Sequence, residues 1–358
     1  MTEHGDLLEK YEIAEKIGKG GMGLVYRARQ KSLDRPVAIK MLARELADSA
    51  EYVERFIAEA KTIARMRNHP NIVEVYDFIE TPENFYIVME LVEGQPLNRL
   101  MQQEGRLPME QSLAIMSEVA RALDHAHQAD VVHRDIKPEN VFVDNHNHVK
   151  VMDFGVAHLV GGGGTKTRTG LVLGTPTYMS PEQARGDTVD ARTDIYAMGV
   201  LLFQLATGSL PFVADTALAV AMKQITDDPP RPRDLNPLIP DLLEAAILKA
   251  LKKNPDERFQ TAREFADFLE SAEMKQALGE SRKAGLEMEN IETVVDASPL
   301  QIDKQIETSE DNSEEIPVAP ENSAEPDDKH LKPMDWLLAF IFFAAGLTLA
   351  YQILTIAG

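Results

Sequence analysis

The spacing of apolar side chains over the first 90 residues predicts a small β-rich region with one helix. Apolar and polar side chains alternate between residues 11 and 17, as in a half-buried strand. Residues 24–29, 37–40 and 85–88 are short β-prone runs, so we expect strands there as well. Residues 51–67 predict an amphipathic helix instead, because apolar side chains recur at helical spacing at Val53, Phe56, Ile57, Ala60, Ile63 and Ala64.

A long acidic segment lies in the last quarter of the chain. Residues 280–329 contain 15 acidic and 4 basic side chains and few clustered apolar ones. Such a composition buries too little apolar surface to offset the entropy lost on folding. We therefore predict a disordered acidic linker over residues 279–333, with a peripheral helix in residues 280–291 as the alternative for that part.

The most apolar stretch of the chain is residues 336–357, which carry no charge. A helix needs about 20 such residues to cross a bilayer. Trp336 and Tyr351 lie near the two ends, as interfacial aromatic residues do, and two lysines before the segment favour a cytoplasmic N-terminal side. The first ten residues lack the apolar region of a signal peptide. We expect a single-pass anchor in the cell membrane, in contact with lipid, with essentially no extracytoplasmic domain; a buried core helix is the alternative.

The amino-acid composition excludes several classes of function. The chain has 358 residues, of which 44% are hydrophobic, enough for two folded units or one large bilobal unit. The absence of cysteine excludes disulfides, cysteine nucleophiles and thiolate metal sites. The net charge is −21, which argues against nucleic acid as a partner, because that affinity depends on basic side chains.

A glycine-rich run joins the first two predicted strands. Gly18, Gly20 and Gly23 form the pattern G-x-G-x-x-G, which Val25 follows. Dinucleotide-binding folds share this pattern, but a helix follows it there, whereas residues 24–29 favour a strand. Glycine allows the backbone to approach phosphate groups closely. An ordinary hairpin turn is the alternative for this run taken alone.

The most informative stretch is Val132-His133-Arg134-Asp135-Ile136-Lys137-Pro138-Glu139-Asn140, followed by a predicted strand and Asp153-Phe154-Gly155. Together with the glycine run and Val37-Ala38-Ile39-Lys40, this ordered set resembles the protein kinase family. The phrases GGMGLVY and YMSPEQARG resemble bacterial receptor-type serine/threonine kinases in particular.

The resemblance covers residues 11–278 and implies an α+β, bilobal protein-kinase-like fold. A small lobe of antiparallel strands plus one helix would span residues 11–89, and a mostly helical lobe would span residues 95–278. The implied cofactors are ATP and Mg²⁺ (or Mn²⁺), bound in the cleft between the lobes.

The resemblance also implies which residues form the nucleotide site. Glu59 would hold Lys40 through an ion pair, and Lys40 would bind the α- and β-phosphates. Asn140 and Asp153 would ligate the metal ion with oxygen atoms. The remaining nucleotide contacts would come from Gly18, Gly20, Gly23, Val25, Ala38, Met89, Glu90, Val92 and Phe142.

The implied catalytic roles are those of phosphoryl transfer to a hydroxyl group. Asp135 would orient the hydroxyl group and accept its proton, while Lys137 would neutralise charge on the transferred phosphoryl group. Thr175 would connect Asp135 to Lys137. The resemblance implies that Lys137 and Thr175 both favour serine and threonine hydroxyl groups of proteins as phosphate acceptors. One departure is Ser180, which replaces an alanine of the family pattern.

The segment between Gly155 and Glu182 has the composition of a phosphorylated loop. It contains four consecutive glycines, which make ordering costly, and then Thr167 and Thr169. In similar kinases an arginine at the position of Arg134 pairs with a phosphate group on this loop. We expect autophosphorylation at one or both threonines, for which a homodimer could act in trans. A plain flexible loop is the alternative.

The leading prediction is a serine/threonine protein kinase that signals at a membrane, and other functions fit the sequence less well. The main alternative is a membrane-tethered pseudokinase scaffold, although no implied catalytic residue is missing. A small-molecule kinase is disfavoured by the implied peptide-positioning segment at residues 175–182. Thr293 and Asp296 resemble a phosphothreonine docking site, but four residues carry little information.

Overall fold

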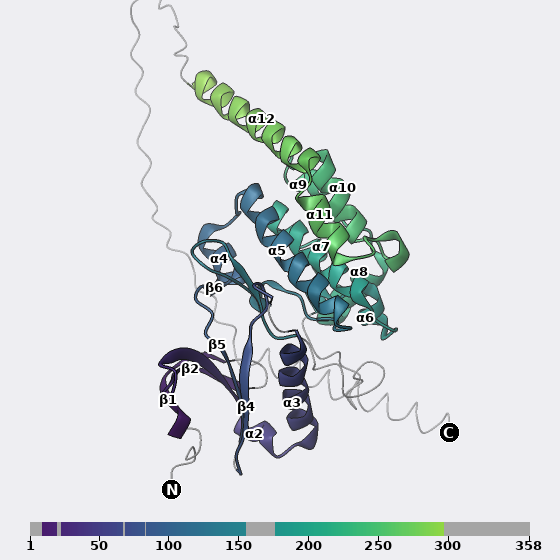
Figure 1. Ribbon diagram of the computed structural model, residues 1–358. Helices are drawn as coiled ribbons and strands as arrows, with labels where there is room; N and C mark the ends of the chain where they lie inside the picture. Colours follow the sequence, from purple (N-terminus) through teal and green to yellow (C-terminus); the bar gives the residue numbers. More distant parts are fainter. Residues whose placement is uncertain (1–8, 20–22, 67–68, 83, 155–175, 297–358) are drawn as a thin grey trace, which may run out of the picture. The chain divides into compact units, whose positions relative to one another are not determined.

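The computed structural model describes residues 9–19, 23–66, 69–82, 84–154 and 176–296. The chain divides into two units, Met1–Ser298 and Pro299–Gly358, and all described residues belong to the first. This unit has the predicted α+β, bilobal fold class (Figure 1).

The strands form two sheets. Five strands of the N-lobe are antiparallel in the order β1-β2-β3-β5-β4, and three short strands of the C-lobe have the order β6-β7-β8. Their bounds are β1 Tyr11–Lys19, β2 Gly23–Gln30, β3 Arg35–Leu42, β4 Val75–Glu80, β5 Phe85–Glu90, β6 Gln95–Pro96, β7 Val141–Val143 and β8 Val149–Val151.

Helices make up most of the C-lobe, while α2 and α3 belong to the N-lobe. The α-helices are α2 Arg44–Ala47, α3 Ala50–Arg65, α4 Leu97–Glu104, α5 Met109–Gln128, α6 Pro181–Arg185, α7 Ala191–Thr207, α8 Ala217–Thr226, α9 Pro232–Leu235, α10 Asp241–Ala250, α11 Ala262–Leu269 and α12 Ala272–Asp296. The described 3₁₀ helices are η1 Pro138–Asn140, η3 Pro176–Tyr178 and η4 Pro255–Glu257.

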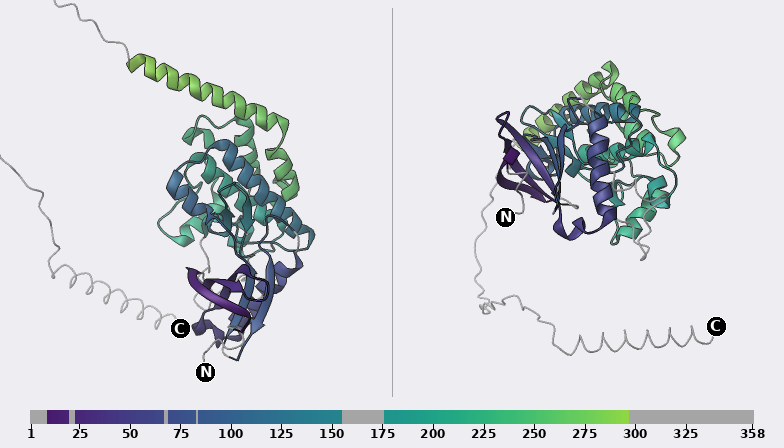
Figure 2. Two further views of the ribbon diagram at one scale, coloured as in Figure 1. Left: turned by 60° about the vertical axis from the view of Figure 1, so that its left-hand side comes forward. Right: turned by 60° about the horizontal axis from the view of Figure 1, so that its bottom comes forward.

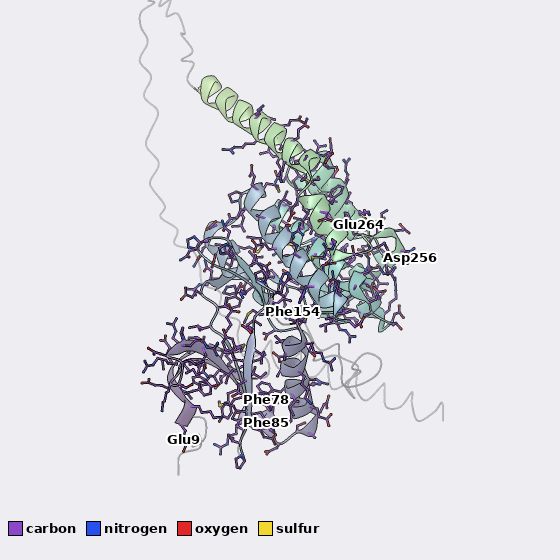
Figure 3. The ribbon with its side chains drawn as sticks, viewed as in Figure 1. Glu9, Phe78, Phe85, Phe154, Asp256 and Glu264 are labelled. Atoms are coloured by element: carbon purple, nitrogen blue, oxygen red, sulfur yellow. The ribbon has the colours of Figure 1, made fainter. Side chains whose placement is uncertain are left out.

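Alternation of side chains along β3 divides the N-lobe core into two parts. Val37 and Ile39 are fully buried on one face of the sheet, against neighbours on β1, β2 and β5. On the other face Leu42 packs with Phe56 of α3, as the helical spacing predicts. Helix α3 therefore lies along this second face (Figures 1 and 2). At the edge of this face the rings of Phe78 on β4 and Phe85 on β5 pack with their centroids 6.4 Å apart (Figure 3).

Helix α7 forms the centre of the C-lobe. Its sequence is apolar on almost every side, which is typical of a helix that other helices surround. Helices α5, α10 and α11 all pack against it. The loops that carry the candidate catalytic residues begin from this rigid core.

Gly23 has a structural role apart from any ligand. A Cβ atom at this position would lie 1.8 Å from the carbonyl oxygen of Met41, so a side chain would break the pairing of β2 with β3. Gly18 differs, because a Cβ atom there would meet only Val25 at an ordinary distance of 3.7 Å. Packing of the described residues therefore explains glycine at position 23 but not at position 18.

The predicted start of the acidic linker needs correction. Helix α12 continues to Asp296, so residues 279–296 are helical and the alternative weighed for residues 280–291 holds. The reason is local, because eight of the twelve residues 280–291 are Glu, Arg, Lys, Ala, Leu or Met, which favour helix. Buried Met274 attaches the start of α12 to the C-lobe core, and the helix then leaves the other helices (Figure 2).

The predicted membrane anchor and the rest of the predicted linker lie outside the described residues. Within the described ranges, no helix combines the length and the apolarity that crossing a membrane requires.

Candidate active site

Three ionisable side chains from distant parts of the chain meet between the lobes. Lys40 on β3 places its Nζ atom 2.6 Å from Oε1 of Glu59 on α3. The same Nζ atom lies 2.8 Å from Oδ1 of Asp153, which follows β8. Lys40 and Glu59 are only 6% and 8% exposed. The structure thus brings together the lysine and the glutamate that the sequence analysis paired, with the implied metal ligand beside them.

The charges of this trio stabilise one another. Burial opposes the charge of Lys40, but the two carboxylates outweigh it and raise the pKa of Lys40 above its ordinary value. Lys40 in turn lowers the pKa of Asp153. Burial raises the pKa of Glu59 in spite of the neighbouring lysine. The raised pKa keeps the Lys40 amine protonated at neutral pH, which suits it to binding phosphate groups.

Apolar side chains line the same face of the N-lobe sheet beside Lys40. The register pairs Val25 with Lys40 and Ala38 with Met89, and side chains two apart on β3 point the same way. Ala38 and Met89 are buried, and Val25 packs on their cluster. Phe142 is half-buried between two buried neighbours on β7, so it points away from them. Val25, Ala38 and Met89 thus form an apolar surface beside Lys40 on which a flat aromatic group such as adenine can pack.

The predicted hinge residues follow on β5 and the chain after it. The amide of Glu90 donates to the carbonyl oxygen of Glu74 (2.8 Å), and its carboxylate pairs with Lys150 (2.7 Å). A nucleotide could therefore meet only the carbonyl group of the Glu90 backbone. Val92 is half-buried against the main hydrophobic core, beside Leu91.

The loop between α5 and β7 carries Asp135 with its side chain partly exposed. Lys137 Nζ lies 2.6 Å from Asp135 Oδ2. Asn140 Nδ2 donates to the same carboxylate oxygen (3.1 Å) and to the Asp135 backbone oxygen (2.7 Å). The side chain of Asp135 is 42% exposed. The carboxylate is thus oriented from one side and open on the other, as a general base requires.

Asp194 holds this loop in a strained conformation. Its buried carboxylate accepts hydrogen bonds from the amides of His133 and Arg134, both at 2.8 Å, and lies 2.8 Å from His127 Nε2. Arg134 has φ = 67°, a left-handed conformation that few side chains adopt. Asp194 begins a segment, Asp194 to Gly199, that contributes to the resemblance to the kinase family, but that motif does not indicate which groups its carboxylate binds. The available signal was a carboxylate within the apolar run of a buried helix, which must find partners.

The implied metal ligands Asn140 and Asp153 fit a magnesium ion bound together with a nucleotide. The amide of Met152 donates to the carbonyl oxygen of Asn140 (2.8 Å) and so ties the two segments together. Asn140 uses its Nδ2 atom on Asp135, which leaves Oδ1 for a ligand. Asp153 gives one oxygen to Lys40, and its side chain is 52% exposed. Within the described ranges no three His, Asp or Glu side chains form a metal cluster, but Mg²⁺ needs only one or two carboxylates plus phosphate and water oxygens.

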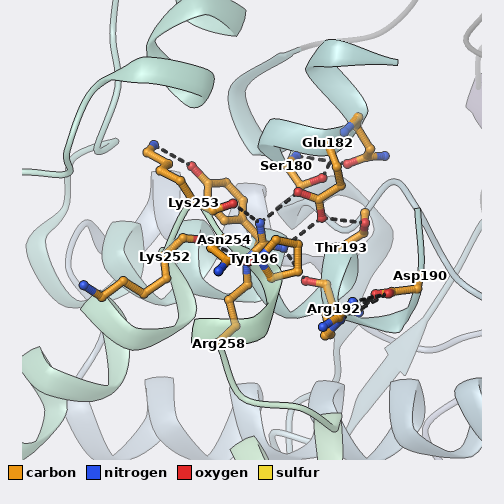
Figure 4. Close-up of polar contacts among 12 residues, drawn as sticks. Ser180, Glu182, Asp190, Arg192, Thr193, Tyr196, Lys252, Lys253, Asn254 and Arg258 are labelled. Carbon is orange, nitrogen blue, oxygen red and sulfur yellow. Dashed lines mark hydrogen bonds and ion pairs between the residues drawn. The ribbon is translucent and has the colours of Figure 1, made fainter. Parts of the chain in front are cut away.

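An ion pair anchors the segment that carries Ser180 to the C-lobe core (Figure 4). Two nitrogens of Arg258 each lie 2.8 Å from an oxygen of Glu182, and Thr193 donates to the same carboxylate. Ser180, the departure from the family pattern, caps α6 by accepting a hydrogen bond from the amide of Gln183. The substitution therefore preserves the anchor.

Four predicted site residues lie outside the described residues: Gly20, Thr167, Thr169 and Thr175. Every other predicted site residue lies within the described ranges.

Comparisons with known proteins agree with this geometry. A model of the protein kinase domain matches residues 11–268. The chain is 38% identical over 342 residues to serine/threonine-protein kinase PrkC of Bacillus subtilis, which covers 94% of this chain and 52% of PrkC. It is 44% identical over 274 residues to serine/threonine-protein kinase pkn3 of Myxococcus xanthus, a match that covers 74% of this chain and 50% of pkn3. It is 42% identical over 269 residues to serine/threonine-protein kinase PknB of Mycobacterium tuberculosis, a match that covers 74% of this chain and 43% of PknB. The chain spans about half the length of these relatives.

Proposed function

The chain belongs to the protein kinase family, and from this premise we propose that it is an ATP-dependent serine/threonine protein kinase. It transfers the γ-phosphate to Ser and Thr hydroxyl groups of proteins, phosphorylates its own segment 155–182, and signals from the cytoplasmic face of a membrane. The observation that carries the proposal is the meeting of Lys40, Glu59 and Asp153 from three distant elements.

The residues divide the work of phosphoryl transfer, which depends on positioning and charge more than on covalent catalysis. Lys40, held by Glu59, binds the α- and β-phosphates of ATP. Asp135 orients the acceptor hydroxyl group and takes its proton as the new O–P bond forms. The bond between the γ-phosphorus and the ADP oxygen breaks in the same step. Asn140 and Asp153 hold Mg²⁺, which supplies further positive charge.

Lys137 supports serine and threonine as acceptors. Its Nζ atom is already 2.6 Å from the carboxylate of Asp135, so it can neutralise charge on the transferred phosphoryl group at the point of attack. This lysine is also the residue that the resemblance associates with Ser/Thr specificity.

Arg134 supports regulation by phosphorylation. Its Nε atom is buried and has no hydrogen-bond partner among the described residues. A phosphate group adds about −1.5 to −2 charges and three acceptor oxygens, which suits such a guanidinium group. We assign the phosphate to Thr167, Thr169 or both.

Autophosphorylation is the direct test of the proposal. The full chain incubated with Mg²⁺ and labelled ATP is expected to label itself on residues 155–182, and Thr167→Ala/Thr169→Ala is expected to lose about 90% of that label if these residues are the main acceptors. Peptide mass spectrometry locates the phosphate groups.

Two controls sharpen this test. A larger tagged Asp135→Asn chain mixed with the wild type distinguishes the routes, because label on the tagged chain requires transfer between two copies, as in a homodimer. Equal labelling of Asp135→Asn alone and of the wild type would contradict autophosphorylation.

Residues 336–357 are proposed as the membrane anchor, on the grounds of their apolarity and length. Deleting residues 333–358 is expected to move the protein from the membrane pellet to the supernatant by at least about tenfold. Deleting residues 303–328 of the acidic segment is the matched control and should leave the protein with the membranes. Retention of the first variant in the pellet would refute the anchor.

No observation favours the alternative of a pseudokinase scaffold. The described members of the catalytic set are all present, and their side chains make the contacts that catalysis needs.

A further inference from the structure

A buried glutamine on α8 holds the backbone of η3, the short helix that precedes Ser180. Gln224 is 0% exposed. Its Nε2 atom donates to the carbonyl oxygens of Pro176 (3.3 Å) and Thr177 (2.6 Å). Buried backbone carbonyls need partners, and here a single side chain from another helix serves two of them. The position of η3 therefore depends on the orientation of one amide group.

Two further side chains fix that amide group. Tyr196 on α7 donates from its hydroxyl group to Gln224 Oε1 (2.6 Å), which determines which end of the amide faces η3. Lys253 donates from Nζ to the Tyr196 hydroxyl oxygen at 3.2 Å (Figure 4). The same Nζ atom donates to the backbone oxygen of Gln224 at 2.9 Å. Lysine, tyrosine and glutamine thus form a continuous chain of hydrogen bonds that ends at η3.

Lys253 is a half-buried cation that the proposed chemistry does not use. Its Nζ atom lies 4.2 Å from the centre of the Phe212 ring. Burial lowers the pKa of Lys253 to about 8, with Asp228 and Asp227 acting to raise it and Arg258 and Arg185 to lower it. The ammonium group is therefore mostly protonated at pH 7 and loses its proton within the range in which an enzyme can be assayed.

The segment after η3 is joined to the catalytic loop. Gln183 donates from Nε2 to the backbone oxygen of Arg134 (2.7 Å), next to Asp135. Tyr178, the last residue of η3, donates to Gln204 on α7 (2.6 Å). No contact of Gln224, Tyr196 or Lys253 described here involves Lys40, Glu59 or Asp153. A change in this network is expected to displace the acceptor side of the site and to spare the nucleotide side.

We propose that Lys253, Tyr196 and Gln224 are positioning residues for the protein substrate, which they serve by holding the backbone of residues 176–178 in place. The inference rests on the proposed kinase function, in which the segment up to Glu182 positions the acceptor peptide. It adds that the ammonium group of Lys253 controls how well that peptide binds.

Steady-state kinetics of the full chain test this assignment. The acceptor is a synthetic peptide that copies residues 163–173, and both the peptide and ATP are varied. Gln224→Met and Lys253→Met are each expected to raise the peptide KM by about tenfold and to change kcat and the ATP KM by less than about twofold. Lys249→Met is the matched control, because Lys249 also lies over an aromatic ring, 4.0 Å from the centre of Phe259, and is not in contact with the network.

The pH dependence separates positioning from a loss of stability. The peptide KM of the wild type is expected to rise between pH 7 and pH 9 as Lys253 loses its proton, with the midpoint near its pKa of about 8. Lys253→Met should lack this rise and show the high KM throughout, whereas Lys253→Arg should keep a low KM to pH 9 because arginine remains charged.

The outcomes distinguish this inference from the proposed function. If the wild type transfers no phosphate, the proposed function is wrong, and this inference is overturned with it. If the wild type is active and both methionine variants keep the wild-type peptide KM, only this inference is overturned. If the peptide KM of the wild type and that of Lys253→Met change with pH in the same way, this inference is overturned as well. Gln224 is fully buried; if Gln224→Met does not fold, the test rests on Lys253→Met and Lys253→Arg, because Lys253 is only half-buried.

Discussion

Asp135→Asn is expected to slow phosphoryl transfer by about 10²–10⁴-fold, the usual contribution of a positioned general base. Asparagine keeps the size of the side chain but cannot accept the proton of the hydroxyl group. The lysine trio on the nucleotide side should be unaffected, since Lys40 contacts Glu59 and Asp153 and not Asp135. The implied metal ligand Asn140 donates to the Asp135 carboxylate (3.1 Å), but asparagine keeps an oxygen acceptor there, and the Asp135 backbone oxygen (2.7 Å) is unchanged. Initial rates with labelled ATP and a basic protein acceptor measure the loss.

The controls for this variant separate catalysis from folding and from binding. Asp256→Asn, at the exposed carboxylate labelled in Figure 3, removes a surface ion pair with Arg192 (2.6 Å) and should keep full activity. Calorimetric titration with a non-hydrolysable ATP analogue should give the same Kd for Asp135→Asn and wild type, within about threefold. Activity of Asp135→Asn above one-tenth of the wild-type rate would contradict the role assigned to Asp135.

Arg258→Leu is expected to lower the free energy of unfolding by about 3–5 kcal/mol, because it leaves a buried carboxylate without its partner. The Arg258 side chain is fully buried and binds Glu182 through two hydrogen bonds of 2.8 Å. Urea unfolding of the full chain, followed by circular dichroism, measures the change. Arg27→Leu is the matched control: its pair with Glu15 is exposed on both sides (54% and 67%) and should contribute at most about 1 kcal/mol.

A double variant tests whether the unpaired charge causes the loss. Glu182→Leu/Arg258→Leu should recover much of the stability, since a buried ion pair and an apolar pair of similar volume are often equivalent. If the double variant is no more stable than Arg258→Leu, the loss does not come from the charge on Glu182. It then comes from packing or from the backbone oxygens of Arg192, Lys252 and Lys253, to which Arg258 also donates.

The stability of the Glu182–Arg258 pair should depend on pH in a defined direction. Burial would raise the pKa of Glu182, but the hydrogen bonds and charge of Arg258 lower it below its ordinary value of 4.5. A carboxylate with a lowered pKa stabilises the folded state above its unfolded pKa and loses that contribution as the pH falls through the folded value. The difference in stability between wild type and Arg258→Leu should therefore be full at pH 7 and shrink below about pH 4.5.

The elements of the N-lobe were largely predictable from local sequence. Alternation predicted β1, and helical spacing over residues 51–67 predicted α3, which the structure has at Ala50–Arg65. The candidate catalytic residues were identified by the order of short motifs, which resemble those of a known family. Helix α12 was underestimated, because acidity was read as disorder although the same residues have good helix propensity.

The sequence by itself determined most strands and the helix of the N-lobe, through side-chain type and spacing, and the order of its motifs indicated which residues carry chemistry. Only the tertiary structure decided which buried polar groups are partners. Lys40 and Asp153 are 113 residues apart, and Gln224 meets Thr177 from 47 residues away. Periodicity shows that a side chain is buried, but its hydrogen-bond partner comes from whichever element packs against it, and that depends on long-range packing.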